Sequence, residues 1–161
     1  MMDAGGPEAL LEAVQTSEQQ ELRGSAVWAL VNMTQTSPYA EEIRSQLSAK
    51  GAVGVLVGLL TNARQTSDTE KHLEALKALS NIALSAPAED VDANAVARDL
   101  IALVKESLSG EASVATGAVS ALVNLSKKSD AFRMALRENG GLELVADELL
   151  THTGNEGLAQ M

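Results

Sequence analysis

The chain has 161 residues and a formal net charge of −10, from 12 basic and 22 acidic side chains. This charge argues against nucleic acid as a partner, because binding to phosphates depends on clustered Lys and Arg. Cysteine is absent, which excludes disulfides and thiolate metal sites, and no apolar run reaches the roughly 18 residues that predict insertion into a membrane. We therefore expect a cytoplasmic protein, with the nucleus also permitted.

The first predicted elements are two helices of unequal length. The block Gly5-Gly6-Pro7-Glu8-Ala9-Leu10-Leu11 is typical of a turn that leads into a helix. A longer helix follows around Asn32. At 100° per residue its apolar positions form one stripe, and Asn32 points roughly the opposite way. The stripe comprises Ala26, Val27, Leu30 and Met33.

A shorter helix and a glycine turn come next. Ser37-Pro38 offers an N-cap followed by proline at the first helical position, which predicts a helix through Leu47. Gly51 fits a tight turn into another helix, since glycine adopts positive φ without steric cost. Thr61 to Thr69 reads as a polar loop. Within and after it, Ser67-Asp68-Thr69-Glu70 reads as a capping box for a second long helix, around Asn81.

The third stretch departs from this pattern. Pro87 to Ala97 stands where another short helix is expected, but it is acidic and weakly patterned. Asp99 follows where the other copies carry small residues, so we expect the turn there to be altered or absent. A third long helix surrounds Asn124, and Ser129 opens a last short helix through Glu138, before the turn at Gly140-Gly141.

An internal repeat unites these elements. The tetrad Ala-Leu-x-Asn occurs at 29–32, 78–81 and 121–124, and its asparagines are 49 and 43 residues apart. A period of roughly 40 to 47 residues is typical of stacked two- or three-helix repeats. We predict repeats at 3–49 (with a partial start), 50–97 and 98–138, and the start of a fourth at 139–161. Both ends look cut, so we expect a longer protein and self-association through uncapped ends.

The blocks Gly-Gly-x-x-x-Leu-Val and Ala-Leu-x-Asn resemble the armadillo repeat family. The resemblance covers nearly the whole chain and implies an all-α fold, a right-handed superhelical solenoid of three-helix repeats. In that family the long third helices line the concave side, and an asparagine ladder hydrogen-bonds the backbone of an extended peptide. By this resemblance, the expected peptide contacts are Asn32, Asn81 and Asn124.

Helical geometry adds neighbours on the same face. The positions four residues before each asparagine are Trp28, Lys77 and Ser120, and those three residues after the first and third are Gln35 and Lys127. Trp28 is predicted opposite the buried stripe, where a large aromatic side chain is often a binding anchor. Its segment is similar to the Trp-Asn array of importin-α. That array occurs only once here, and Lys77 and Lys127 would tolerate or prefer acidic ligand side chains.

Competing interpretations remain open at this point. Each asparagine could bond to a neighbouring repeat instead, and Trp28 could pack against the preceding half-unit. The leading function is a noncatalytic scaffold for a peptide or protein; the alternative is an assembly module acting through end-to-end or convex-surface contacts with folded partners. No nucleophile–base motif, metal cluster or cofactor loop supports an enzyme. The lone His72 and His152 are expected on the surface.

Overall fold

The computed structural model describes residues 5–63, 69–87, 91–108, 110–144 and 146–147, and these are all-α, with no strand among them. None of the described helices is both long and apolar enough to cross a membrane. The helices are α1 (Gly5–Thr16), α2 (Gln20–Gln35), α3 (Ala40–Ala49), α4 (Ala52–Ala63), α5 (Thr69–Ile82), α6 (Ala93–Ser107), α7 (Ala112–Lys128) and α8 (Asp130–Glu138). Helical residues continue at 141–144 and 146–147.

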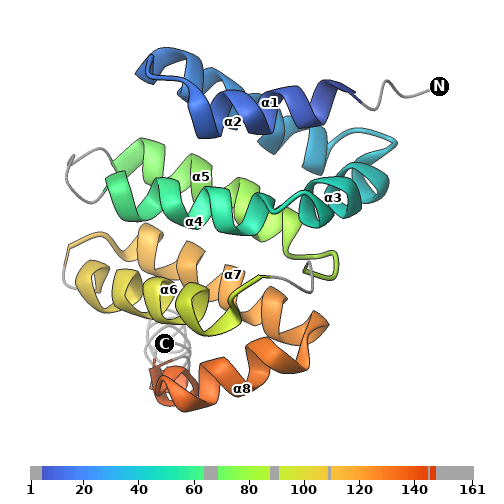
Figure 1. Ribbon diagram of the computed structural model, residues 1–161. Coiled ribbons are helices and arrows are strands. Elements are labelled where there is room, and N and C mark those ends of the chain that lie inside the picture. The colour runs from blue at the N-terminus through green and yellow to red at the C-terminus, as the bar shows by residue number, and fades with distance from the viewer. Residues whose placement is uncertain (1–4, 64–68, 88–90, 109, 145, 148–161) are drawn as a thin grey trace, which may run out of the picture.

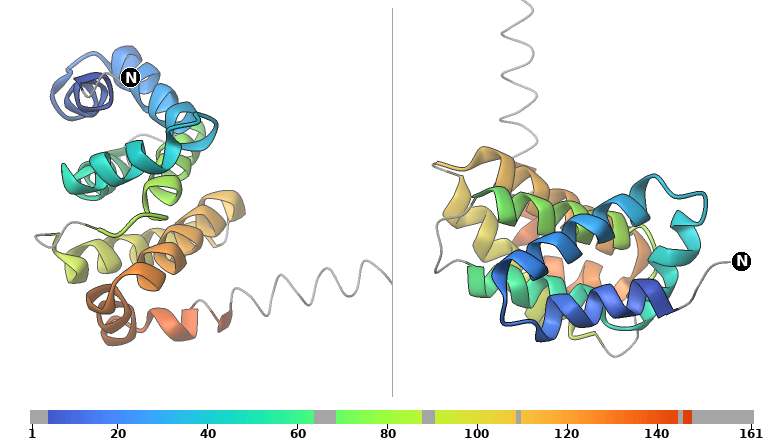
Figure 2. Two further views of the ribbon diagram at one scale, coloured as in Figure 1. Left: turned by 90° about the vertical axis from the view of Figure 1, so that its right-hand side faces the viewer. Right: turned by 90° about the horizontal axis from the view of Figure 1, so that it is seen from above.

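The helices stack in pairs, α1 with α2, α4 with α5, and α6 with α7 (Figure 1). Seen from the side, α2, α5 and α7 follow one another along one side of the stack, and α1, α4 and α6 follow along the other (Figure 2). The shorter α3 lies at one end of the α4–α5 pair, and α8 packs on α6 and α7. The three long helices that carry the asparagines are therefore neighbours in space.

The predicted apolar stripe forms the core. Leucine two residues before each asparagine is buried, as is alanine six residues before it, so the repeated positions pack α2, α5 and α7 against their partners. These residues are Leu30, Leu79 and Leu122, with Ala26, Ala75 and Ala118. Small alanine side chains allow close approach between helices, which keeps the core dense although the chain has only one Phe.

Two of the predicted glycine turns are confirmed by their backbone angles. Gly51 has φ of 84° between α3 and α4, and Gly140 has φ of 73° after α8. Side chains with a Cβ rarely adopt these angles, because the Cβ crowds the following carbonyl. Glycine therefore ends one helix and allows the next to begin within two or three residues.

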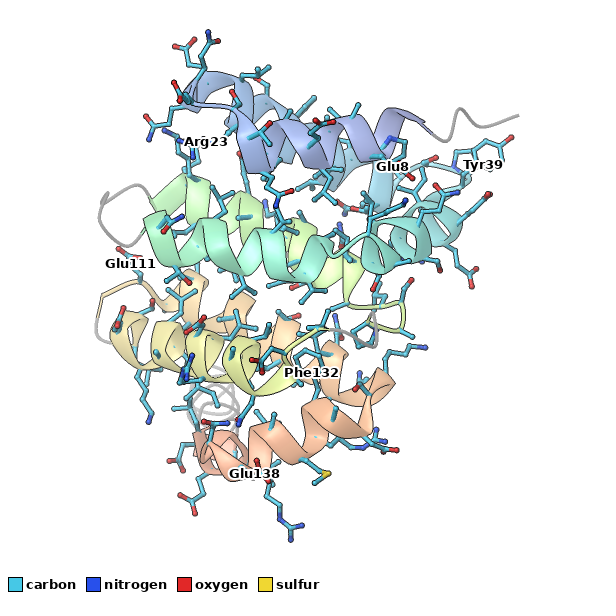
Figure 3. The ribbon with its side chains drawn as sticks, viewed as in Figure 1. Glu8, Arg23, Tyr39, Glu111, Phe132 and Glu138 are labelled. Atoms are coloured by element: carbon cyan, nitrogen blue, oxygen red, sulfur yellow. The ribbon has the colours of Figure 1, made fainter. Side chains whose placement is uncertain are left out.

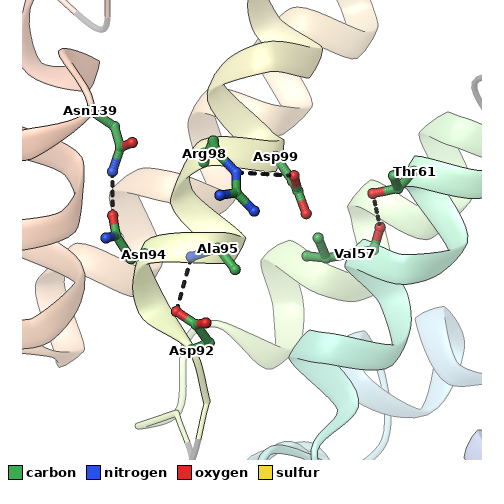
Figure 4. A network of polar contacts seen from close by, with 8 residues as sticks. All are labelled: Val57, Thr61, Asp92, Asn94, Ala95, Arg98, Asp99 and Asn139. Atoms are coloured by element: carbon green, nitrogen blue, oxygen red, sulfur yellow. Dashed lines mark hydrogen bonds and ion pairs between the residues drawn. The ribbon is translucent and has the colours of Figure 1, made fainter.

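Among the described residues, the range from Pro87 to Ala97 does not form the separate short helix that was predicted. Instead α6 begins at Ala93 and runs without interruption to Ser107, across the repeat boundary predicted between 97 and 98. Asp92 caps it, since its Oδ1 accepts a hydrogen bond from the Ala95 amide at 3.1 Å (Figure 4). Asp99 stands at the position of Gly51, where a Cβ disfavours the positive φ of a turn, so the helix passes straight through.

The start of α3 also differs from the prediction, whereas that of α8 agrees with it. Ser37 Oγ accepts from the Tyr39 amide at 3.1 Å, but the residues up to Tyr39 form a turn and the helix begins only at Ala40. Ser129 does cap α8, accepting from the Phe132 amide at 3.4 Å. For the predicted capping box at α5, Ser67 and Asp68 lie outside the described residues, and the helix begins at Thr69.

Arginines on the short helices bind the ends of the long helices that precede them. Arg44 of α3 donates Nη1 to the Thr34 carbonyl at 3.0 Å, and Arg133 of α8 donates Nη1 to the Ser126 carbonyl at 2.8 Å. Thr34 and Ser126 are equivalent, each two residues after a repeat asparagine. A guanidinium group here satisfies a carbonyl at the negative end of the helix dipole. The same contact thus recurs in two repeats.

Candidate functional site

A groove crosses the side of the stack formed by α2, α5 and α7. It has a volume of about 630 Å³. Six of the eight side chains predicted to contact a peptide line it together: Trp28, Asn32, Gln35, Lys77, Asn81 and Ser120. Asn124 and Lys127 are not among its lining residues. Lys127 instead lines a neighbouring hollow that α7 forms with α8.

Trp28 is a large, exposed apolar side chain in the groove. It is 60% exposed, so the prediction that it points away from the buried stripe is confirmed. An exposed indole offers a large, stiff apolar surface together with one N–H donor. Ordering it costs little conformational entropy, because only two side-chain torsions are fixed.

The three repeat asparagines have different hydrogen bonds. Asn32 Nδ2 donates within its own helix, to the Trp28 carbonyl at 3.1 Å. Asn81 Nδ2 reaches back to Thr34 Oγ1 at 3.2 Å, and Asn124 Nδ2 reaches back to the Ser80 carbonyl at 3.1 Å. Two asparagines therefore connect neighbouring long helices, as the structural interpretation of the repeat expects.

These hydrogen bonds leave other donor and acceptor groups of the three side-chain amides available. A side-chain amide has two N–H donors and one carbonyl oxygen, and each bond above uses one of the donors. All three asparagines are half-buried, so part of each side chain still faces solvent. Asn81 and Asn124 can thus connect neighbouring helices with one hydrogen, and all three amides have remaining groups that can meet a ligand.

The charges along this side of the stack are mixed near α5 and basic near α8. Lys77 is exposed in the groove, and the half-exposed Glu74 lies one turn before it on α5. The hollow between α7 and α8 has Lys127, Arg133 and Arg137 around an apolar floor that includes Leu136. This concentration of cations contrasts with the net charge of −10 for the chain. It would favour an anionic ligand at that end.

Some lining residues were not predicted from the sequence. Leu73, Ser113 and Thr116 extend the groove towards the beginnings of α5 and α7. They stand eight or eleven residues before an asparagine, which at 100° per residue is the same face as the position four before it. Continuing the face by two more turns would have found them.

Gly117 shapes the floor of the groove. A Cβ at this position would lie 3.2 Å from Leu76 Cδ1, which is closer than ordinary van der Waals contact. The glycine therefore allows α7 to approach α5 closely at the point where both helices line the groove.

The prediction that His72 lies on the surface is wrong. Its side chain is buried, only 6% exposed, and it lines a small cavity between α2, α4 and α5. On α5 it stands nine residues before Asn81, opposite that asparagine on the helix and therefore on the buried stripe. His152, the other histidine, lies outside the described residues.

The described residues contain no group of three or more His, Asp or Glu side chains placed to hold a metal ion. The groove is lined by amides and hydroxyls that can form hydrogen bonds, an exposed indole and side chains of both charges. No protein-family model, curated protein or solved structure matches this chain.

Proposed function

We propose that this protein is a noncatalytic scaffold that binds an extended segment of a partner protein along the groove across α2, α5 and α7. One observation carries the proposal. Six ligand-competent side chains, predicted from a repeated register and including the exposed Trp28, line one groove together. Burial within the stack does not account for a large exposed aromatic side chain that lines this groove.

The armadillo arrangement is part of this proposal. It is supported by the repeated helix pairs, by the positive φ of Gly51 and Gly140, and by the matching contacts of Arg44 and Arg133 with the preceding long helices. In such an arrangement α2, α5 and α7 would line the concave side of a superhelix. The missing short helix before α6 would then be a local departure from the repeat.

The size of the groove suits a short extended peptide. Packed helices lie about 8–10 Å apart, so the step from α2 to α7 is about 20 Å. An extended chain covers about 3.3 Å per residue, which gives about six residues. We expect an apolar or aromatic ligand side chain over Trp28 and an acidic side chain near Lys77.

Peptide selection tests the proposal. A random peptide library is panned on the protein, and the enriched sequences are measured against Trp28→Ala and Lys77→Glu. We expect each substitution to weaken binding at least about tenfold, the size of a typical interface anchor. Tyr39→Ala and Lys105→Glu are matched controls, because both side chains are exposed and outside the groove. Equal binding by all four variants would refute a groove site.

An assembly module is the second candidate, and exposed apolar side chains favour it. Met134 on α8 is 61% exposed and Leu142, just after α8, is 54% exposed. Both could bury against another folded surface, including a second copy of the chain. Sedimentation over a range of concentrations tests this: an increase in mass that Met134→Lys removes and Trp28→Ala leaves unchanged would favour assembly over peptide binding.

A further inference from the structure

A second cavity lies between the first turns of α2 and α5 and the last turns of α4. Its volume is about 130 Å³, whereas a single water needs only about 10–15 Å³ of such space. The apolar part of its wall is Val27, Leu59, Leu60 and Ala75, and the polar part is Gln20, Arg23, Asn62, Lys71, His72 and Glu74. The cavity thus has room for a small organic molecule, and its wall has an apolar part and a polar part that can contact such a molecule.

His72 is a buried polar side chain of this cavity without a hydrogen-bond partner among the described residues. The side chain is only 6% exposed, and neither ring nitrogen has a hydrogen-bond partner among the described residues. A neutral imidazole has one N–H donor and one acceptor nitrogen, and buried groups of this kind are nearly always paired in native proteins. The cavity beside the ring is where a partner can be placed.

Arg23 supplies a second unpaired donor from another helix. Its Nε is buried and has no hydrogen-bond partner in the described part of the chain, while the rest of the side chain is half-exposed. Figure 3 shows Arg23 extending from α2 towards the α4–α5 pair. His72 belongs to α5, so donors from two different layers line the same cavity.

The charges around the cavity favour an anion. Among the described residues that line the cavity, Arg23 and Lys71 are cations and Glu74 carries the carboxylate. The cavity also lies at the N-terminal turns of α2 and α5, where the helix dipole is positive. An arginine paired with a second donor is well suited to a carboxylate, which accepts through two oxygens.

We propose that this cavity binds a small monocarboxylic acid with a short apolar chain. The carboxylate accepts hydrogen bonds from Arg23 Nε and a ring N–H of His72, and the aliphatic end lies against Leu59, Leu60 and Val27. This site is separate from the peptide groove proposed above, although Glu74 lines both. Whether this cavity binds an acid does not depend on whether the groove binds a peptide.

Imidazole NMR provides the direct test, since the chain has only two histidines. His72→Gln assigns the ring signals by elimination. The wild-type protein is titrated with sodium butyrate at constant ionic strength, and with butyramide as the neutral match. We expect a saturable shift of the His72 signals with butyrate, a rise in Tm, and at least about tenfold weaker binding of butyramide, because charged hydrogen bonds are the stronger ones.

Variants separate this site from general anion binding. Arg23→Gln should weaken butyrate at least about tenfold while His72 still reports on the cavity. Lys105→Gln removes an exposed cation that does not line the cavity and should bind butyrate as the wild type does. An unsaturable drift shared by both histidines, an equal response to butyramide, or full binding by Arg23→Gln would overturn the proposal and leave a cavity that holds only water.

Discussion

Asn124 of α7 donates its side-chain amide to the main-chain carbonyl of Ser80 in α5, at 3.1 Å. Asn81 makes a comparable bond one layer earlier, to Thr34 Oγ1. Thr34 is fully buried and itself donates to the Leu30 carbonyl at 2.6 Å. The repeat asparagines therefore take part in stacking before any ligand arrives, which changes what their substitution should do.

The first prediction concerns these asparagines. Asn81→Ala and Asn124→Ala should each lower the free energy of unfolding by about 1 kcal/mol, the typical net value of one hydrogen bond. Asn32→Ala should cost less, because its amide bonds only within α2 and alanine is the better helix former. Urea denaturation of the three variants measures the difference, and equal losses would contradict the inter-helix role.

The turn glycines give the second prediction. Gly51→Ala and Gly140→Ala should each destabilise by about 1–2 kcal/mol, because an alanine pays the Cβ penalty at positive φ. Gly58→Ala is the matched control. Gly58 is exposed within α4 and a Cβ there meets nothing within 4 Å, so the change should stabilise by about 0.5–1 kcal/mol. Thermal unfolding should show a lower Tm for the two turn variants and a higher Tm for Gly58→Ala. Destabilisation of similar size at all three positions would argue against a special turn geometry.

Arg44 leads to the third prediction. Replacing it with alanine should cost about 1–2 kcal/mol, since the Thr34 carbonyl at the end of α2 loses a charged donor. Arg98→Ala provides the comparison, because Arg98 is exposed and its ion pair with Asp99 spans 3.9 Å (Figure 4). Such a pair contributes at most about 1 kcal/mol. Guanidinium denaturation should rank Arg44→Ala as clearly the less stable variant, and the reverse order would contradict the account.

The fourth prediction tests where α6 begins. Asp92→Ala removes the acceptor of the Ala95 amide and should destabilise by about 1 kcal/mol, whereas Asp92→Asn keeps a good cap and should cost little. Hydrogen exchange of the amides near Ala95 should accelerate in the alanine variant only. Unchanged exchange there would show that the helix does not depend on this cap.

Local rules predicted the repeated parts of the fold. The buried stripe follows from helical periodicity, the turns at Gly51 and Gly140 follow from glycine conformations, and the cap at Ser129 follows from its hydroxyl. The same rules could have found the early start of α6, because Asp92 is a strong N-cap and Asp99 replaces the glycine that a turn at positive φ favours. Asp99 did predict an altered or absent turn, and α6 passes through it; expecting every repeat to have the same helices concealed only the cap at Asp92.

The sequence predicted which side chains of the candidate site share a helix face, but not which hydrogen bonds they form with neighbouring helices. Trp28 and Lys77 fall on one face of their helices by periodicity alone, and the groove contains both. The bonds from Asn81 and Asn124 depend on the spacing and offset of neighbouring helices, which a single sequence does not specify. His72 was predictable on the helical wheel, since it stands opposite Asn81; its isolation from other metal ligands gave no information about burial.

The fluorescence of Trp28, the one tryptophan in the chain, tests the central claim most directly. The protein is titrated with the best peptide from the panning experiment, and emission is compared with that of Lys77→Glu and Lys105→Glu. Peptide binding over the exposed indole should shift its emission to shorter wavelength with a saturable dependence, and Lys77→Glu alone should weaken the affinity at least about tenfold. A peptide that binds with unchanged Trp28 emission and equal affinity for both variants would contradict the groove as the binding site.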